Sequence, residues 1–206
     1  MLKYLSVLKK TFAVGLLLCS LSTVAQKTAF DPLSASIEEN IATPAVQPKH
    51  NTAVASAMTP LLKAIRNHGF NAQTVRSGEV IMVSIPAAEL FAPNQRQLGE
   101  TAKSSLKLLF PYIRLHNKYK VIVAVHCADT GDDMYREELT ADRANAIDEL
   151  FFNLNGGADT GIIPYGLGDD EPLAPNTSLK NRDKNRRVEI YFVPTQEFID
   201  SAKKRK

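Results

Sequence analysis

The stretch YKVIVAVHCADTGDDMYREELTADRANAI, residues 119–147, decides the fold. Its first eight residues are almost all apolar, as in a β-strand that is buried on both faces of a sheet. A polar, Asp-rich loop follows, and after Thr140 apolar residues recur at helical spacing, among them Ala144, Ile147 and Phe151. The stretch therefore predicts a buried strand that leads through a polar loop into an amphipathic helix.

Arg143 stands at an unusual place in this pattern. Thr140 is a suitable N-cap, which predicts that Arg143 is the third residue of the helix. A helix start carries partial positive charge, so a guanidinium needs an anion there. Two explanations stay open from the residues alone. Free backbone N–H groups and a bidentate guanidinium suit a carboxylate ligand, and a structural ion pair with Asp129, Asp132 or Asp133 satisfies the guanidinium equally well.

The remaining segments extend this unit into a small sheet with helices. Further strands are predicted at 72–76, 79–86, 162–166 and 186–193. The first two flank a Ser77-Gly78 turn and form a predicted hairpin. A long helix is predicted over residues 95–117, with a kink at Pro111. Because strands and helices alternate, we expect an α/β sandwich with helices packed on a small mixed β-sheet.

Both ends of the chain carry segments outside this predicted domain. A basic stretch, an apolar stretch and small residues in succession form the pattern of a cleaved secretory signal peptide over residues 1–25. Residues 26–57 are rich in Ala, Thr, Ser, Pro, Gln and Asn, which predicts a flexible tether. The domain is then expected over residues 58–198, followed by a basic tail over residues 199–206.

Composition and motifs argue against several classes of function. The net charge is only +3, and no basic stripe carries interleaved aromatic residues, so nucleic acid is not expected as a partner. His126, Cys127 and Asp129 lack the spacing of a zinc site. No Ser-His-Asp signature or glycine-rich phosphate loop occurs in the sequence. We therefore expect a protein that is not an enzyme and that holds no metal and no cofactor.

Four motifs follow one another along the chain: IPAAELFAPNQRQL, VIVAVHCADTGDDMYREELTADRANAI, YGLGDDEPLAPN and RDKNRRVEIYFV. Over residues from about 79 to 196, this ordered set resembles the OmpA-like C-terminal domain, a peptidoglycan-binding module also found in Pal and MotB proteins. The last motif matches the family's Asn-Arg-Arg-Val closing strand almost letter for letter. The resemblance implies the OmpA-like fold, in agreement with the sandwich expected from the patterns.

The resemblance also implies a ligand and the residues that hold it. The family binds the peptide stem of peptidoglycan through diaminopimelate, which presents carboxylate and ammonium groups together. By position, Arg143 is the family's carboxylate-binding arginine, Arg186 is the first arginine of the closing motif, and Phe91 forms part of the wall. An anionic ligand explains why Arg143 can stand where the predicted helix begins.

Two departures from the family motif concern the same predicted site. The family's Gly-His-Thr-Asp reads Val-His-Cys-Ala here, so the aspartate expected to hold the ligand ammonium is Ala128. Asp129 is the candidate replacement, although one residue along a loop moves the Cα atom by about 3.8 Å. Arg136, an added cation at the rim, replaces the usual asparagine. Losing one charged hydrogen bond costs roughly 1.5–3 kcal/mol, so these departures weaken the predicted site.

Two functions from different classes follow from this reasoning. The first is a non-catalytic, exported periplasmic module, associated with the outer membrane, that anchors to the cell wall through diaminopimelate. Its predicted ligand-binding residues are Arg143, Arg186, Asp129 and Phe91. The second is a degenerate copy of the fold that acts as an envelope protein–protein adaptor without wall binding.

Overall fold

The structure, a computed structural model, describes residues 30–204. The predicted signal peptide, residues 1–25, lies outside this range, as do the first residues of the predicted tether and the last two of the predicted tail. Within residues 30–204 no helix has both the length and the apolar character needed to cross a membrane.

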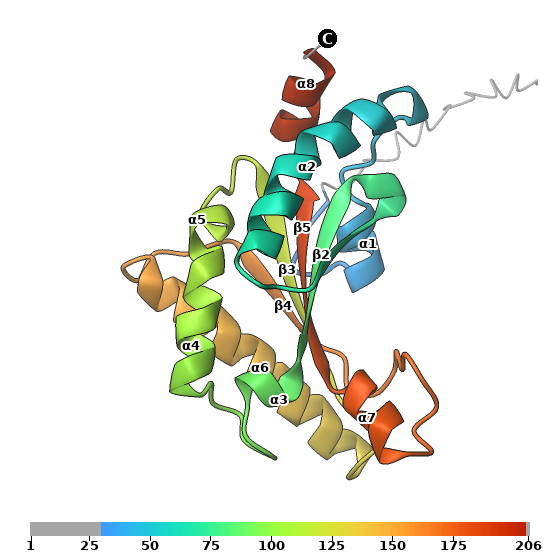
Figure 1. Ribbon diagram of the computed structural model, residues 1–206, viewed down its shortest axis with the longest axis vertical. Coiled ribbons are helices and arrows are strands. Elements are labelled where there is room, and N and C mark those ends of the chain that lie inside the picture. Colours follow the sequence, from blue (N-terminus) through green and yellow to red (C-terminus); the bar gives the residue numbers. More distant parts are fainter. Residues whose placement is uncertain (1–29, 205–206) are drawn as a thin grey trace, which may run out of the picture. The chain divides into compact units, whose positions relative to one another are not determined.

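A five-stranded sheet lies at the centre of the part that begins at Asp31 (Figure 1). Its strands stand in the order β1-β2-β5-β3-β4, with β3 and β4 parallel and the other neighbouring pairs antiparallel. The predicted mixed sheet with packed helices is thereby confirmed. The strands are β1 (Ala72–Val75), β2 (Val80–Pro86), β3 (Tyr119–His126), β4 (Ile162–Gly166) and β5 (Arg187–Pro194).

The turn of the predicted hairpin is a short 3₁₀ segment, η2 (Arg76–Gly78). All three of its residues have positive φ, at 47° for Arg76, 53° for Ser77 and 87° for Gly78. Glu79 then offers its carboxylate to Arg76 Nε at 2.9 Å. This ion pair holds a backbone conformation that residues with side chains rarely adopt.

Strand β5 lies at the centre of the sheet, between β2 and β3, and all eight of its residues are buried. Its sequence alternates polar and apolar residues, which is typical of a strand with one solvated face. Both faces are nevertheless covered. Val188, Ile190 and Phe192 belong to the large core on one face, and Tyr191 belongs to a second, smaller core on the other.

The polar residues of β5 form a buried network on this second face. Glu189 accepts hydrogen bonds from Arg187 Nε at 2.7 Å and from the Tyr191 hydroxyl at 2.5 Å, and His126 Nε2 lies 3.4 Å from its Oε2. Burial on its own would raise the pKa of Glu189, but the neighbouring His126 and the hydrogen bonds from Tyr191 and Arg187 hold that pKa at about 2. A charged carboxylate is thus kept inside the protein because it is fully paired.

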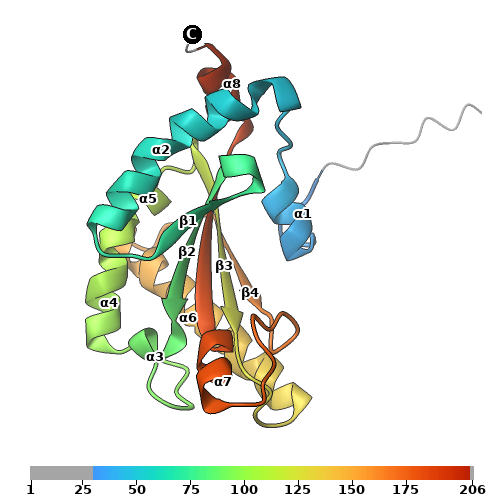
Figure 2. The ribbon, with the colours of Figure 1, turned by 45° about the vertical axis from the view of Figure 1, so that its right-hand side comes forward.

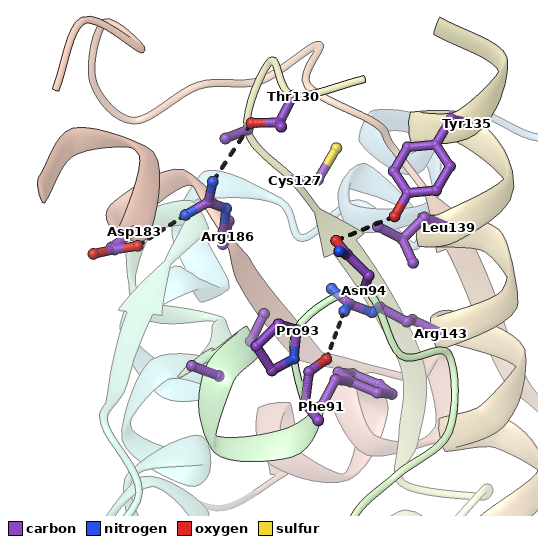
Figure 3. Close-up of a pocket in the computed structure, with 14 residues that line it drawn as sticks. Phe91, Pro93, Asn94, Cys127, Thr130, Tyr135, Leu139, Arg143, Asp183 and Arg186 are labelled. Atoms are coloured by element: carbon purple, nitrogen blue, oxygen red, sulfur yellow. Dashed lines mark hydrogen bonds and ion pairs between the residues drawn. The ribbon is translucent and has the colours of Figure 1, made fainter. Parts of the chain in front are cut away.

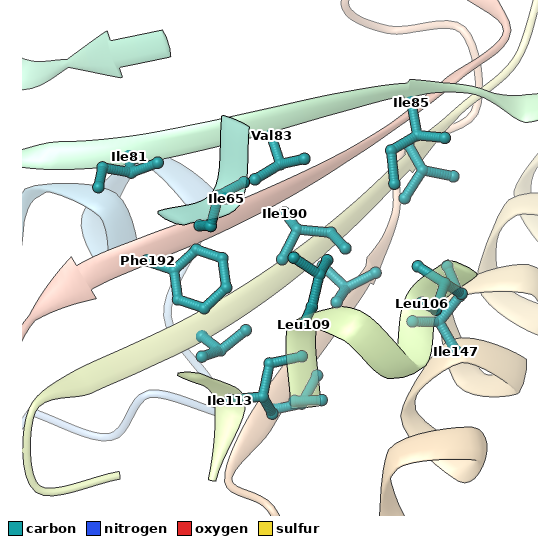
Figure 4. Close-up of a cluster of buried hydrophobic side chains, with 14 of the residues drawn as sticks. Ile65, Ile81, Val83, Ile85, Leu106, Leu109, Ile113, Ile147, Ile190 and Phe192 are labelled. Atoms are coloured by element: carbon teal, nitrogen blue, oxygen red, sulfur yellow. The ribbon is translucent and has the colours of Figure 1, made fainter. Parts of the chain in front are cut away.

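Helices cover the first face of the sheet, as Figure 2 shows for α2, α4 and α5. Their apolar side chains meet those of β2, β3 and β5 in one cluster, which includes Leu109, Ile147 and Phe192, all fully buried (Figure 4). The helices of this layer are α2 (Asn51–Asn67), α4 (Glu100–Leu106), α5 (Phe110–Ile113) and α6 (Asp133–Leu154).

The helix predicted over residues 95–117 is divided in the structure. It begins at Glu100, and the 3₁₀ segment η3 (Lys107–Leu109) separates α4 from α5. Pro111 stands in the first turn of α5, where its missing N–H leaves no helical hydrogen bond unmade. Pro111 therefore marks the start of α5 and does not kink one continuous helix.

The predicted flexible tether, residues 26–57, is wrong from Ile37 onward. This segment contains α1 (Ile37–Ala42), the 3₁₀ segment η1 (Pro48–His50) and the first turns of α2. Helix α1 lies against the second face of the sheet (Figure 2), where Ile37 is buried. Large apolar residues are few here, but Val54 and Met58 lie four apart on the buried side of α2 and are completely inaccessible. Position, rather than number, decides whether such residues can pack.

Asn40 fixes α1 to the sheet by hydrogen bonds. Its side chain is fully buried and donates to the Pro32 carbonyl and to the Tyr165 hydroxyl, both at 2.6 Å. Its Oδ1 accepts from Lys120 Nζ at 3.0 Å, and burial together with the nearby charge of Arg76 lowers the pKa of Lys120 to about 8. The domain therefore includes residues that precede the predicted boundary at residue 58.

The predicted basic tail, residues 199–206, is also wrong as far as the structure describes it. Helix α8 (Gln196–Lys204) continues the domain, with Thr195 Oγ1 accepting the Phe198 N–H at 3.2 Å. Ile199 and Ala202 enter the large core. Lys203 and Lys204 stand in the last turn of this amphipathic helix, whose apolar residues Phe198, Ile199 and Ala202 pack on the core.

Candidate ligand-binding site

A cavity of about 410 Å³ lies at the end of the sheet where β3 finishes and β5 begins. Its walls come from α3 (Ala87–Leu90) and the loop after it, from the end of β3, and from α6 (Figure 3). The last wall comes from α7 (Leu179–Asn185) and from Arg186, which follows α7. Phe91, Arg143 and Arg186, three of the four predicted ligand-binding residues, line this cavity together. Asp129, the fourth, is not among the lining residues.

Arg143 is held firmly within the wall of the cavity. Its Nε donates to the Gln95 carbonyl at 2.8 Å, its Nη2 donates to the Ala92 carbonyl at 3.5 Å, and its guanidinium lies 4.7 Å from the centre of the Phe91 ring. Only 6% of the residue is exposed. Burial, more than any nearby charge, lowers the pKa of Arg143 from its usual value.

The predicted place of Arg143 at a helix start is wrong. Helix α6 begins at Asp133, and Asp132 is its N-cap, with a side chain that accepts the Tyr135 N–H at 2.8 Å. Thr140, the predicted N-cap, lies fully buried inside the helix. Arg143 therefore projects from the middle of α6, where the partial charges at the helix ends have little influence.

A structural ion pair does not explain Arg143 either. Asp132 caps α6, Asp133 pairs with Arg136, and Asp129 is exposed on the loop. Among residues 30–204, no carboxylate forms an ion pair with Arg143, whose partners are carbonyl groups and one aromatic ring. The cavity thus presents a buried cation whose counter-charge the described part of the chain does not supply.

The loop after α3 is fastened to α6 from both sides of the cavity mouth. Phe91 is buried and pairs with Leu98 in an isolated antiparallel bridge that closes the loop. Asn94, with a φ of 59°, accepts a hydrogen bond from the Tyr135 hydroxyl at 3.3 Å. Together with the bonds from Arg143, this contact fixes the wall to which Phe91 contributes its ring.

A carboxylate that the sequence analysis missed lies beside Arg186. Arg186 Nη1 donates to Asp183 Oδ1 at 2.9 Å, and its Nη2 donates to Thr130 Oγ1 at 3.5 Å. Asp183 and Arg186 lie three residues apart at the end of α7, so both reach the same side of the helix. The signal in the sequence was this spacing within the RDKNRR motif.

The loop after β3 explains why Asp129 stays away from the cavity. The Thr130 N–H donates to the Ala128 carbonyl at 2.8 Å, which closes a tight turn with Asp129 at its centre. Ala128 is 2% exposed and lines the cavity, whereas Asp129 is exposed. Ala128 therefore lines the cavity at the motif position where the resemblance leads us to expect an aspartate.

The Gly-x-Gly motif positions this end of β3. A Cβ atom on Gly166 would lie 2.3 Å from the Ala141 backbone nitrogen, so only glycine allows β4 to approach α6 this closely. The Gly168 N–H donates to Thr140 Oγ1 at 3.0 Å, and its carbonyl accepts the Cys127 N–H at 2.7 Å. Cys127 lines the cavity as a buried thiol, and burial above all raises its pKa to about 11.

Arg136, the extra cation of the motif, binds neighbouring parts of the chain. Its Nε donates to Asp169 Oδ1 at 2.6 Å, its Nη1 donates to the Gly131 carbonyl at 2.5 Å, and it pairs with Asp133. It is not among the residues that line the cavity. Arg136 thus joins the start of α6 to the loops after β3 and β4, and it brings no free positive charge to the cavity.

The charges of the cavity favour an anionic ligand. Two arginines and one aspartate line it, and most of the other lining side chains are apolar. Arg143 is unpaired, whereas Asp183 and Arg186 largely neutralise each other. A carboxylate that enters the cavity would meet the Arg143 guanidinium, whose orientation is fixed by its hydrogen bonds to Gln95 and Ala92, and a guanidinium of fixed orientation suits bidentate recognition.

Comparison with known proteins identifies a family for the part of the chain that contains these residues. Residues 90–186, which include the four residues Phe91, Ala128, Arg143 and Arg186, match the sequence profile of the OmpA family. Outer membrane porin F of Pseudomonas aeruginosa is 27% identical over 111 residues, which cover 54% of this chain and 31% of porin F.

A second alignment, at 28% identity, covers 66% of the chain and 16% of the photosystem I P700 chlorophyll a apoprotein A2 of Gloeobacter violaceus. The chain thus spans less than a third of either relative.

Solved structures share the fold. A MotB-like protein from Desulfovibrio vulgaris superposes with a TM-score of 0.61 and 24% identity, over 71% of this chain and 97% of that chain. The cell wall anchor of the T6SS from Pseudomonas aeruginosa gives a TM-score of 0.54 and 24% identity, over 68% of this chain and 96% of that chain. Residues 90–186 of this chain thus match the OmpA family, and the solved structures share the fold of the domain that contains these residues.

Proposed function

We propose that this domain binds peptidoglycan without catalysis and anchors to the cell wall through the diaminopimelate residue of the stem peptide. One observation carries the proposal. Arg143, at the position of the family's carboxylate-binding arginine, is a buried guanidinium in a cavity wall, and no carboxylate among the described residues pairs with it. A ligand carboxylate would supply the missing negative charge.

The geometry of Arg143 leaves suitable donors for such a ligand. Its Nε binds Gln95 and one Nη2 hydrogen reaches Ala92, while Nη1 has no hydrogen-bond partner among residues 30–204. The two bonds that do form orient the guanidinium before any ligand arrives. A buried, pre-oriented donor pair binds a carboxylate more strongly than an exposed one, because little side-chain entropy remains to be lost.

The proposed location follows from the family and from the sequence. The chain begins with the pattern of a signal peptide, so we propose export to the periplasm. Porin F is an outer membrane protein by name, and one protein that shares the fold is a cell wall anchor. We therefore place the domain in the envelope, in association with the outer membrane and in contact with the wall.

The second candidate, an envelope adaptor that does not bind the wall, is favoured by Ala128. This residue occupies the place of the family's ammonium-binding aspartate, and its methyl group offers no charge to a zwitterion. Under the adaptor function the cavity would be a remnant of the family's site, and no substitution in it would change wall binding.

Sedimentation with purified sacculi that contain diaminopimelate tests the proposal. The purified protein should sediment with the sacculi, and Arg143→Met should remain in the supernatant, because methionine keeps much of the packing on Phe91 and removes the charge. Arg96→Met is the matched control. Arg96 lies in the same loop region, pairs with Asp142 at 2.7 Å and does not line the cavity, so this variant should still sediment. A protein that stays in the supernatant, or equal sedimentation of all three proteins, would contradict the proposal.

A further inference from the structure

We infer that Asp183 takes over the role of the family's missing aspartate and receives the ammonium group of the ligand. This inference rests on the proposed function and adds the residue that completes the recognition of a zwitterion. The sequence alone pointed instead to Asp129, next to the altered position. The structure places a different carboxylate, from a different helix, in the cavity.

One carboxylate at the cavity is a candidate for binding the ammonium group of the ligand. Asp183 is the one acidic residue among the described residues that line it. Asp129 stands at the centre of the tight turn between Ala128 and Thr130 and is exposed. To reach the cavity, Asp129 would have to break the hydrogen bond that closes this turn, whereas Asp183 needs no change of backbone.

Asp183 is also prepared to accept a cation. Arg186 Nη1 occupies its Oδ1 at 2.9 Å, and its Oδ2 has no hydrogen-bond partner within residues 30–204. A carboxylate can accept about four hydrogen bonds, so an ammonium can bind Oδ2 while Arg186 stays in place. Arg186 in turn reaches Thr130 at 3.5 Å, so its guanidinium links Asp183 to the loop after β3.

The two charges that a zwitterion needs lie on different sides of the cavity. Figure 3 shows Arg143 on the α6 side, with Asp183 and Arg186 on the α7 side. A ligand whose carboxylate binds Arg143 can therefore turn its ammonium toward α7. In the family's motif the anion comes from the loop after β3. In this chain the anion that binds the ammonium group comes from α7.

The inference is tested by calorimetric titration with two stem peptides that differ at one group. The first contains diaminopimelate with its free distal ammonium, and the second carries the same residue with that amine acetylated. The wild-type protein should prefer the free amine by at least about tenfold, as expected for one charge-assisted hydrogen bond. Asp183→Asn should lose this preference and bind both peptides alike. Asp129→Asn, which removes the same charge from the neighbouring loop, should keep the preference.

A rescue experiment separates this role from a general loss of negative charge. Ala128→Asp in the Asp183→Asn background should restore the preference for the free amine, because it returns the anion to the family's position. Loss of the preference in Asp129→Asn but not in Asp183→Asn would overturn the inference. A preference that survives both single substitutions would overturn it too. Either result leaves the proposed function standing as long as the wild-type protein binds the wall and Arg143→Met does not, so the two failures can be told apart.

Discussion

A buried guanidinium such as that of Arg143 can strengthen the binding of an anionic ligand, although it lowers the stability of the unliganded protein. A guanidinium that is 6% exposed has lost most of its contact with water, and its hydrogen bonds to carbonyl groups offset only part of the free-energy cost of desolvation. We therefore expect Arg143 to lower the stability of the unliganded protein, and we propose that a ligand carboxylate offsets this cost. Buried charges without a partner are characteristic of binding sites rather than of cores.

The first prediction concerns this cost. Arg143→Met should leave the free energy of unfolding of the unliganded protein unchanged or raise it by about 1 kcal/mol, because the desolvated charge is removed and the packing on Phe91 is kept. The carbonyls of Gln95 and Ala92 belong to exposed loop residues and can bind water instead. Urea unfolding of the wild type and the variant measures the difference. A loss of more than about 2 kcal/mol would show that Arg143 is chiefly structural.

Glu189 supports a second prediction at the residue scale. Because the fold holds its pKa at about 2, well below the value in an unfolded chain, the folded protein binds fewer protons than the unfolded chain between these values. The stabilisation is therefore complete above about pH 5 and is lost as the pH falls toward 2. For this buried carboxylate it amounts to roughly 3 kcal/mol.

Thermal melts between pH 2 and pH 7 check this prediction. Glu189→Gln should lower the melting temperature at pH 7 and should flatten the decline on the acidic side, since the variant has no carboxylate to protonate. Glu149→Gln on the exposed side of α6 serves as the control and should follow the wild type. Parallel curves for the wild type and Glu189→Gln would mean that another group causes the acid sensitivity.

At the scale of the element, the helix α1 changes the extent of the domain. Asn40 joins α1 to β3 and β4 through Lys120 and Tyr165, and Ile37 covers apolar residues of the second face. Removing the Asn40 side chain deletes its hydrogen bonds to Pro32, Tyr165 and Lys120. We predict that Asn40→Ala lowers the free energy of unfolding by about 2 kcal/mol and exposes residues 31–50 to proteases.

Limited proteolysis followed by mass analysis measures the second effect. The wild-type protein should resist cleavage from about residue 31 onward, and Asn40→Ala should be cut between residues 31 and 50. Asn153→Ala on exposed α6 is the matched control and should be cut no faster than the wild type. Rapid cleavage of this segment in the wild type would restore the tether that the sequence suggested.

The elements show where sequence patterns suffice and where they fail. Five strands could be predicted, because runs such as YKVIVAVH and IIPYG are apolar and bounded by turn residues. The start of α6 could not, since residues 133–139 are mostly polar and resemble a loop, although Asp132 caps them as a helix. Segments 37–57 and 196–204 were underestimated for a similar reason. The few apolar residues of these segments order them by packing against the rest of the domain, and composition alone does not reveal such packing.

The whole molecule brings distant segments together at one end of the sheet. The cavity combines residues from positions 87–94, 127–143 and 183–186, and the registers of β3 and β5 set their relative places. Resemblance to the family located Phe91, Arg143 and Arg186, since each has a counterpart at the same motif position. It did not point to Asp183, because the spacing of Asp183 and Arg186 in the RDKNRR motif does not show that α7 brings both residues to the cavity.

We propose above all that Arg143 binds the distal carboxylate of diaminopimelate. The most direct measurement is calorimetric titration of the wild type and Arg143→Met with a diaminopimelate stem peptide and with the same peptide carrying lysine, which keeps the ammonium and lacks that carboxylate. We predict that the wild type prefers the diaminopimelate peptide by at least about tenfold and that Arg143→Met shows no preference. Equal binding of both peptides by the wild type, or an unchanged preference in Arg143→Met, would contradict the account.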